Sequence, residues 1–316
     1  MLIYNLELIN FLSEKMADVL NTIFVILIMI FLGYFLKRIN LLDTKDVDVL
    51  NKLVINVAMP CLIFYSLYSA DLSNITTLAI MPLINISIGA ISGLIVFIIL
   101  SYKKYSKKQK WGAVIPVVIG NTAFLGFPIV LGVFGQGPLI GAIFYDMGSL
   151  ILFLSLSVIL MVNFGGTFKE VIKRILSFPV LWAVIIGILF NIFNIYIGEI
   201  ATDLIGYLAA AAIPIIMISL GLSLKFKGLL KNLKVASLDV IVKLMIAPII
   251  ALILVSLIGL KEIEGTVAIV EAAMPSGMLT LVLAVTYELD FNLAADCAIT
   301  TTILSLITLP IIIGIL

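Results

Sequence analysis

The fold is decided by one stretch of sequence, Gly120-Asn121-Thr122-Ala123-Phe124-Leu125-Gly126-Phe127-Pro128. It lies inside an apolar run from about residue 112 to 135, which is long enough to cross a membrane. Pro128 lacks a backbone N–H and crowds the carbonyl group one turn earlier, so we expect the helix to break just before it. Broken backbone at membrane depth is tolerated only where protein buries it or where it lines a water-filled cavity. The interruption therefore predicts a binding site.

A second interruption, Glu271-Ala272-Ala273-Met274-Pro275-Ser276-Gly277, lies inside the apolar run 263–287. Interrupted helices at corresponding places in the two halves of a chain are the best sequence indication of a transporter's binding site. If a half-helix begins at mid-depth after each break, each start presents unpaired N–H groups and about half a positive charge. Two such starts would attract an anion. We expect seven residues to bind it: Asn121, Thr122, Gly126, Pro128, Pro275, Ser276 and Gly277.

The composition is that of an integral membrane protein, because 63% of the 316 residues are hydrophobic and only 12% are charged. Soluble domains contain about 45–50% apolar and about 25% charged residues. The apolar runs are too long and continuous for the strands of a β-barrel, so we expect an all-α protein in a lipid bilayer. The absence of histidine removes the commonest general base and metal ligand. We expect no enzymatic activity, metal, cofactor or nucleic-acid partner.

Apolar runs of about 20 residues predict ten transmembrane helices in a single membrane domain, residues 1–316. The first repeat, about 18–162, contains spans 18–36, 47–68, 77–100, 112–134 and 139–162. The second repeat, about 178–316, contains spans 178–196, 203–223, 235–258, 263–286 and 292–316. Because five is odd, the second repeat is expected to be inverted relative to the first. Residues 1–17 are expected to form a short interfacial helix or an extension of the first span.

Lysine and arginine predict the orientation. Ten spans place most of these residues in loops on one side, and only Lys15 and Lys261 on the other, with Lys243 inside the eighth span. We therefore expect a multi-pass protein of the cell membrane with both termini outside. The expected cytoplasmic residues are Lys37, Arg38, Lys45, Lys52, Lys103, Lys104, Lys107, Lys108, Lys110, Lys169, Lys173, Arg174, Lys225, Lys227, Lys231 and Lys234.

The two interruptions also carry a family resemblance. Residues 120–128 closely resemble the motif of the auxin efflux carrier family, which includes plant auxin exporters and prokaryotic malate or malonate permeases. The closing region resembles the same family in Ala273-Met274-Pro275, Leu283-Ala284, Tyr287, Thr302 and the stretch Ser305–Pro310. The likeness covers essentially the whole chain, although the long cytoplasmic loop of the plant exporters is replaced here by about fifteen residues.

The resemblance implies a ten-helix inverted repeat whose fourth and ninth helices cross at their breaks. It also implies a homodimer with a scaffold of helices 1, 2, 6 and 7 and a moving transport unit of helices 3–5 and 8–10. The implied activity is elevator-type export of small organic anions such as carboxylates.

Ionisable residues within spans are costly and mark functional sites. Glu271, one turn before Pro275, is predicted to couple proton movement to transport, because an ionised carboxylate there would repel an anionic substrate. Asp146 is predicted to be a second proton or cation site. Asp239 and Lys243 are spaced for a helical ion pair, which we take as structural, with contact between Lys243 and the substrate as the alternative.

Three other functions compete with that of an efflux carrier. A sodium-coupled symporter of the bile-acid type shares the crossed-helix architecture, and Glu271 and Asn121 would suit its ion sites. An intramembrane aspartyl protease requires a Gly-x-Gly-Asp motif that this sequence lacks. A channel or receptor is less compatible with inverted repeats interrupted at the midplane. We therefore expect an efflux carrier, with the sodium-coupled symporter as the alternative.

Overall fold

The protein is described here by a computed structural model covering residues 2–73, 75–224, 232–260 and 262–316, without the side chains of residues 2–19, 174, 175 and 262. Within these ranges the regular structure is helical, and the extended pairing consists of one isolated bridge. The expectation of an all-α membrane protein is therefore confirmed. Lys225, Lys227, Lys231 and Lys261, which contributed to the predicted orientation, lie outside the described residues.

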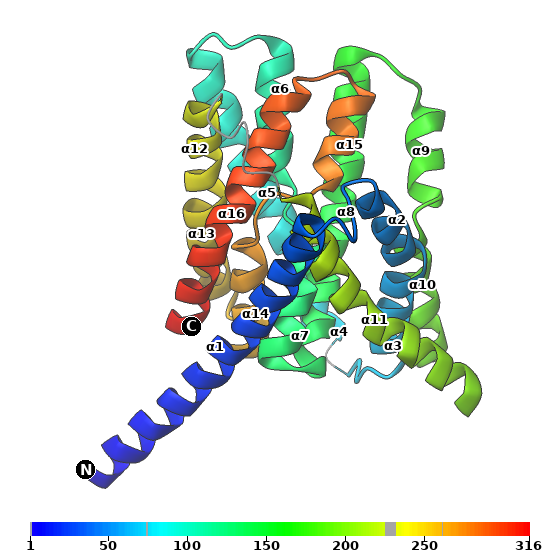
Figure 1. The fold of residues 1–316 in the computed structure, drawn as a ribbon, viewed down its shortest axis with the longest axis vertical. Helices are drawn as coiled ribbons and strands as arrows, with labels where there is room; N and C mark the ends of the chain where they lie inside the picture. The colour runs from blue at the N-terminus through cyan, green and yellow to red at the C-terminus, as the bar shows by residue number, and fades with distance from the viewer. Residues whose placement is uncertain (1, 74, 225–231, 261) are drawn as a thin grey trace.

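The helices follow one another with short connections (Figure 1). The first half contains α1 (Leu2–Arg38), α2 (Asp46–Leu53), η1 (Val54–Ala58), α3 (Met59–Tyr68), α4 (Ile75–Leu78), α5 (Met81–Tyr102), α6 (Lys107–Val118), η2 (Thr122–Gly126), α7 (Phe127–Phe134) and α8 (Gln136–Phe164). The second half contains α9 (Phe168–Leu176), α10 (Pro179–Ile192), α11 (Glu199–Ser223), α12 (Leu233–Ile241), η3 (Val242–Ile246), α13 (Ala247–Ile258), α14 (Glu262–Ala272), α15 (Leu279–Thr286) and α16 (Phe291–Ile315).

Seven helical segments of the described chain are long and apolar enough to cross a membrane. They are Leu20–Arg38, Asp46–Tyr68, Ile75–Tyr102, Gln136–Phe164, Glu199–Ser223, Leu233–Ile258 and Phe291–Ile315. Each coincides with one of the ten expected spans. The first continues the helix that begins at Leu2, so residues 2–17 extend the first span.

The three other expected spans, 112–134, 178–196 and 263–286, are built from shorter helices. The α10 helix has 14 residues, or about 21 Å at 1.5 Å per residue, less than the hydrocarbon thickness of about 30 Å. The other two spans are interrupted, as predicted. In Figure 1, α6 and α15 lie in the upper half of the molecule and α7 and α14 in the lower half, so both interruptions fall near mid-height.

Three π-helical turns stand directly before prolines. The turns η1, η2 and η3 each end two residues before a proline, namely Pro60, Pro128 and Pro248. In each case the residue before the proline donates its N–H five residues back, to the carbonyl of Val54, Thr122 or Val242. A widened turn accommodates the proline ring without ending the helix. Pro128 is consequently inside α7, and the expectation of a break just before it is wrong.

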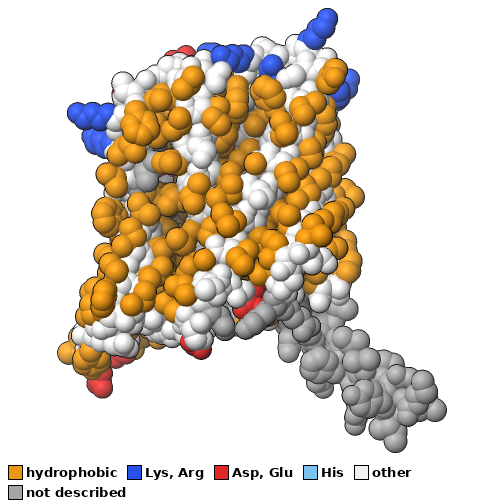
Figure 2. Space-filling view, turned by 180° about the vertical axis from the view of Figure 1, so that it is seen from behind, with side chains coloured by type: hydrophobic (Ala, Val, Ile, Leu, Met, Phe, Trp, Pro, Cys, Tyr) orange, Lys and Arg blue, Asp and Glu red, His pale blue; other side chains and the backbone are white. Residues whose placement is uncertain are grey.

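The outer surface is arranged as a membrane requires. Figure 2 shows a wide band of hydrophobic side chains below an end where Lys and Arg gather. Both chain termini lie toward the opposite end (Figure 1). Inside, one cluster of buried apolar side chains includes Leu125 and Met274, and a second includes Ile119 and Leu283. Each interruption therefore lies between the two clusters.

Candidate functional site

The two interrupted segments pair with each other through their backbones. Gly120 and Ser276 form an isolated antiparallel bridge. The N–H of Asn121 donates to the carbonyl of Pro275 at 2.7 Å, and the N–H of Gly277 donates to the carbonyl of Ile119 at 2.8 Å. Backbone groups released from both helices thus satisfy one another, as buried polar groups must in a membrane. We call this paired region, residues 119–121 and 275–277, the crossing.

Small residues make the close approach at the crossing possible. A Cβ atom added to Gly277 would lie 2.8 Å from the carbonyl oxygen of Gly120, so a side chain at 277 would force the two backbones apart. The N–H of Ser276 is held from a third direction by the hydroxyl of Thr301 in α16, at 3.3 Å. The crossing is therefore fixed by both interrupted segments and by the last helix.

A half-helix begins directly after the crossing on the η2 side. The first backbone bonds of this helix are donated by Leu125 and Gly126, both to the carbonyl of Asn121 at 3.1 and 3.2 Å. The N–H groups of residues 122–124 precede the first of these bonds and are the positive end of the helix. On the other side, α15 begins at Leu279, directly after the crossing. Both half-helix starts expected from the sequence are therefore present, and they adjoin.

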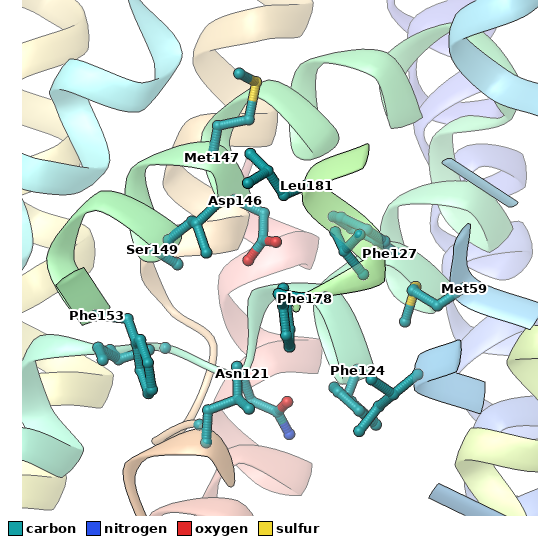
Figure 3. Close-up of a pocket in the computed structure, with 18 of the residues that line it drawn as sticks. Met59, Asn121, Phe124, Phe127, Asp146, Met147, Ser149, Phe153, Phe178 and Leu181 are labelled. Carbon is teal, nitrogen blue, oxygen red and sulfur yellow. The ribbon is translucent and has the colours of Figure 1, made fainter. Parts of the chain in front are cut away.

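A cavity of about 400 Å³ opens next to the crossing. Most of its lining is apolar and comes from η1, α3, η2, α8, α10 and α15, with polar groups contributed by Asn121, Asp146 and Ser149. Figure 3 shows the Asp146 carboxylate turned inward among apolar side chains. The lining residues labelled there are Met59, Asn121, Phe124, Phe127, Asp146, Met147, Ser149, Phe153, Phe178 and Leu181. A volume of this size and character suits a small organic molecule.

Asp146 belongs to a polar network that ties α8 to the crossing. Its carboxylate accepts a hydrogen bond from the hydroxyl of Thr122, and the hydroxyls of Thr122 and Ser149 lie 3.2 Å apart. Asn85 in α5 donates its amide to Ser149 at 2.9 Å and to the carbonyl of Tyr145 at 2.8 Å. Asn85 and Ser149 were not among the residues predicted to form the site. The sequence feature that could have indicated them is that each is a polar residue inside an otherwise apolar span.

Glu271 is buried and does not line the cavity. Its side chain has no exposed surface, and neither carboxylate oxygen has a hydrogen-bond partner in the described structure. The carboxylate occupies the space that a side chain on Gly126 would need. Asp146 and Lys243 act on it electrostatically. Gly126 therefore makes room for Glu271 and does not line the cavity.

Lys243 and Asp239 do not form the expected ion pair. Within the described residues, the ion pair with N···O below 4.0 Å is Lys108–Glu288 at the surface. The wide turn η3 begins between Asp239 and Lys243 and changes the spacing on which the prediction relied. Lys243 instead lies with its ammonium 3.1 Å from the position of a Cβ on Gly120, whereas Asp239 interacts with Cys297 of α16.

The six other predicted binding residues differ in where they lie. Asn121 and Gly277 line the cavity. Thr122 supports Asp146, and Pro275 and Ser276 build the crossing. Pro128 is buried in α7, where its role is to shape the helix after η2. The crossing thus contains four of the seven predicted residues, Asn121, Pro275, Ser276 and Gly277, and two of these, Asn121 and Gly277, line the cavity.

A model of the membrane transport protein family matches residues 18–169 and 164–313 of this chain. The chain belongs to that family, the family of the auxin efflux carriers. An uncharacterized transporter of Methanothermobacter thermautotrophicus is 40% identical over 291 residues, which cover 92% of this chain and 96% of that protein. An uncharacterized transporter of Methanocaldococcus jannaschii is 33% identical over 298 residues, covering 92% and 97%. The family resemblance expected from residues 120–128 is confirmed, and the protein is a membrane transporter.

Proposed function

We propose that this transporter is a secondary carrier that moves small organic anions such as carboxylates, with the crossing and its cavity as the binding site. The observation that supports this most is the adjacency of two half-helix starts, η2 and α15, at the wall of a cavity. Their unpaired N–H groups and positive ends favour a carboxylate. The Asn121 side chain adds a hydrogen-bond donor at the same wall.

The cavity narrows the proposed substrate class. Its lining is mainly Met, Phe, Leu and Ile side chains, so binding favours an anion with an apolar body. Asp146 places an acidic group in the cavity wall, and like charges in a low-dielectric site repel strongly, so a second carboxylate on the substrate would be repelled. A monocarboxylate fits these features better than a small dicarboxylate does.

The proposed mechanism is alternating access by an elevator movement within a ten-helix inverted repeat. In this proposal α1–α3, α10 and α11 form a scaffold that also makes a homodimer, and α5–α8 with α12–α16 move. The cavity supports such a division because its walls come from both groups: Met59 of α3 and Leu181 of α10 face Phe124 of η2 and Met278 before α15. A substrate held between a fixed and a moving wall would be carried by the moving one.

The proposed orientation places the end rich in Lys and Arg in the cytoplasm and both termini outside the cell. The positive-inside rule supports it, since basic residues such as Lys103 and Lys104 follow α5 at that end. Coupling is proposed to involve Glu271, which lies against Gly126, and Asp146, which accepts a hydrogen bond from Thr122. Accessibility of single cysteines at residues 104 and 198 to a membrane-impermeant thiol reagent in intact cells tests the orientation.

Counterflow in proteoliposomes tests the proposed function. Vesicles loaded with one carboxylate are diluted into the same labelled compound, with matched series of aromatic and aliphatic monocarboxylates, dicarboxylates and uncharged amides. We expect accumulation of label with apolar monocarboxylates and not with the corresponding amides. Accumulation of the amides to the same level would show that negative charge is not recognised, and no accumulation of any carboxylate would contradict the proposal.

A further inference from the structure

The carboxylate of Glu271 needs a partner that hydrogen bonding does not supply. Both its oxygens are buried without a donor in the described structure, and the residue is absent from the cavity lining. An isolated carboxylate in such a place is very unfavourable unless a proton or a nearby cation compensates its charge. Two ionisable groups of α8 also act on Glu271: the carboxylate of Asp146, which is a second negative charge, and the hydroxyl of Tyr145.

The cation that acts on the Glu271 carboxylate is the ammonium group of Lys243. Its side chain is only 3% exposed, and its ammonium lies against Gly120 of the crossing. Lys243 and Glu271 attract each other although their charged atoms are more than 4.0 Å apart. Lys243 is likewise absent from the cavity lining. The two residues are therefore buried beside the crossing and do not line the cavity.

We propose that the ammonium of Lys243 is a tethered cation, which occupies a monovalent-cation position beside the crossing and compensates Glu271 there. A sodium ion in the same position would need the same surroundings: a carboxylate and backbone carbonyl groups released by interrupted helices. With the ammonium built into the chain, the crossing is stable without any dissolved cation. This inference concerns residues that do not line the cavity, and it does not depend on which substrate the cavity accepts.

The proposal predicts that a substitution that removes the ammonium and leaves its space empty creates a sodium site. Lys243→Ala leaves Glu271 unpaired beside an empty volume that a small cation can enter. Lys243→Met removes the same charge but keeps an unbranched side chain of similar length, so it fills the space and excludes the ion. Lys243→Ala combined with Glu271→Gln has the space but lacks the carboxylate. Lys243→Met therefore controls for the loss of charge without an empty space, and the double variant controls for the empty space without the carboxylate.

Thermal unfolding of the purified full chain in detergent, followed by the fluorescence of its two tryptophans, measures the effect. Each variant is compared in sodium chloride and in N-methylglucamine chloride at equal ionic strength. We expect the melting temperature of Lys243→Ala to rise by about 3 °C or more in sodium, because a ligand that binds only the folded state stabilises it. The natural chain, Lys243→Met and the double variant should show no difference between the two salts.

Two results would overturn the proposal. One is a sodium-dependent melting temperature in the natural chain, which would mean that a dissolved ion already occupies the position. The other is an equal response of Lys243→Ala and Lys243→Met. If Lys243→Ala is not recovered folded, it is purified with sodium or methylammonium present throughout: recovery supports the proposal, and equal loss with and without these cations counts against it.

Discussion

The backbone N–H of Asn121 donates a hydrogen bond of 2.7 Å to the carbonyl of Pro275, which joins the two halves of the chain at the middle of the molecule. The reciprocal bond from Gly277 to Ile119 makes the connection a two-stranded one. Because both interrupted segments would otherwise expose unpaired polar backbone, the pairing explains how the breaks are tolerated at this depth. Predictions about stability and about transport both follow from it.

Gly277→Ala is expected to destabilise the protein by about 1–3 kcal/mol, because the added methyl group meets the Gly120 backbone, which has no flexible atom to move aside. Gly137→Ala is the matched control, since nothing lies within 4 Å of a Cβ at that position. Thermal unfolding of both variants measures the difference. A Gly277→Ala protein as stable as the Gly137→Ala protein would mean that the crossing is looser than described.

Gly126 and Glu271 are expected to be coupled. Gly126→Ala places a methyl group where the Glu271 carboxylate lies, which we expect to cost about 1–3 kcal/mol. In a Glu271→Ala background the space is vacant, so the same substitution should cost much less. A double-mutant cycle by thermal unfolding gives the coupling free energy, expected to exceed about 0.5 kcal/mol. Additive effects of the two substitutions would show that these residues are not in contact.

Glu271→Gln is expected to abolish the pH dependence of transport. A protonated Glu271 removes a negative charge from the region of the crossing, so the natural carrier should move anions faster at low pH than at high pH. The groups that face Glu271 are Asp146, Tyr145 and Lys243, and Asp146→Asn serves as the comparison for a second titrating acid. Counterflow is measured across a pH series. A Glu271→Gln profile that follows the natural one would assign the pH dependence to another group.

Asp146→Asn is expected to change the selectivity for charge. The substitution removes a negative charge from the cavity wall while the amide keeps the size and can still accept from Thr122. Uptake of dicarboxylates relative to monocarboxylates should therefore rise, by about tenfold for each 1.4 kcal/mol of repulsion removed. The ratio of the two uptake rates is the measurement. Ser149→Ala, which alters the same network without changing charge, should leave this ratio unaltered.

The sequence predicted the interruptions but placed one of them incorrectly. Proline chemistry alone put the break at Pro128, whereas the non-helical residues are Ile119 to Asn121 and the proline is accommodated by η2. The same widened turn precedes Pro60 and Pro248, so in this chain a π-helical turn lets the helix continue through a proline that would otherwise be expected to end it. In the second interruption Pro275 does lie in the unwound segment, and its carbonyl accepts from the partner segment.

The ionisable residues illustrate what spacing can and cannot predict. Their burial followed from hydropathy, and Asp146 and Glu271 do lie beside the crossing. Asp239 and Lys243 do not pair because a π-helical turn intervenes, and each side chain interacts with another element: Lys243 lies against Gly120, and Asp239 interacts with Cys297. Asn85 and Ser149 were missed, since single polar residues in apolar spans are common and only three-dimensional proximity joins these two.

The charge at the crossing offers the most direct test of the account. Asn121→Asp is isosteric and adds one negative charge at the cavity wall where the anion is expected to bind. With a carboxylate identified by counterflow, binding to the purified protein is measured for the natural chain, Asn121→Asp and the uncharged Asn121→Ser. We predict that affinity falls at least tenfold further for Asn121→Asp than for Asn121→Ser. Equal affinities of the two variants would contradict an anion site at the crossing.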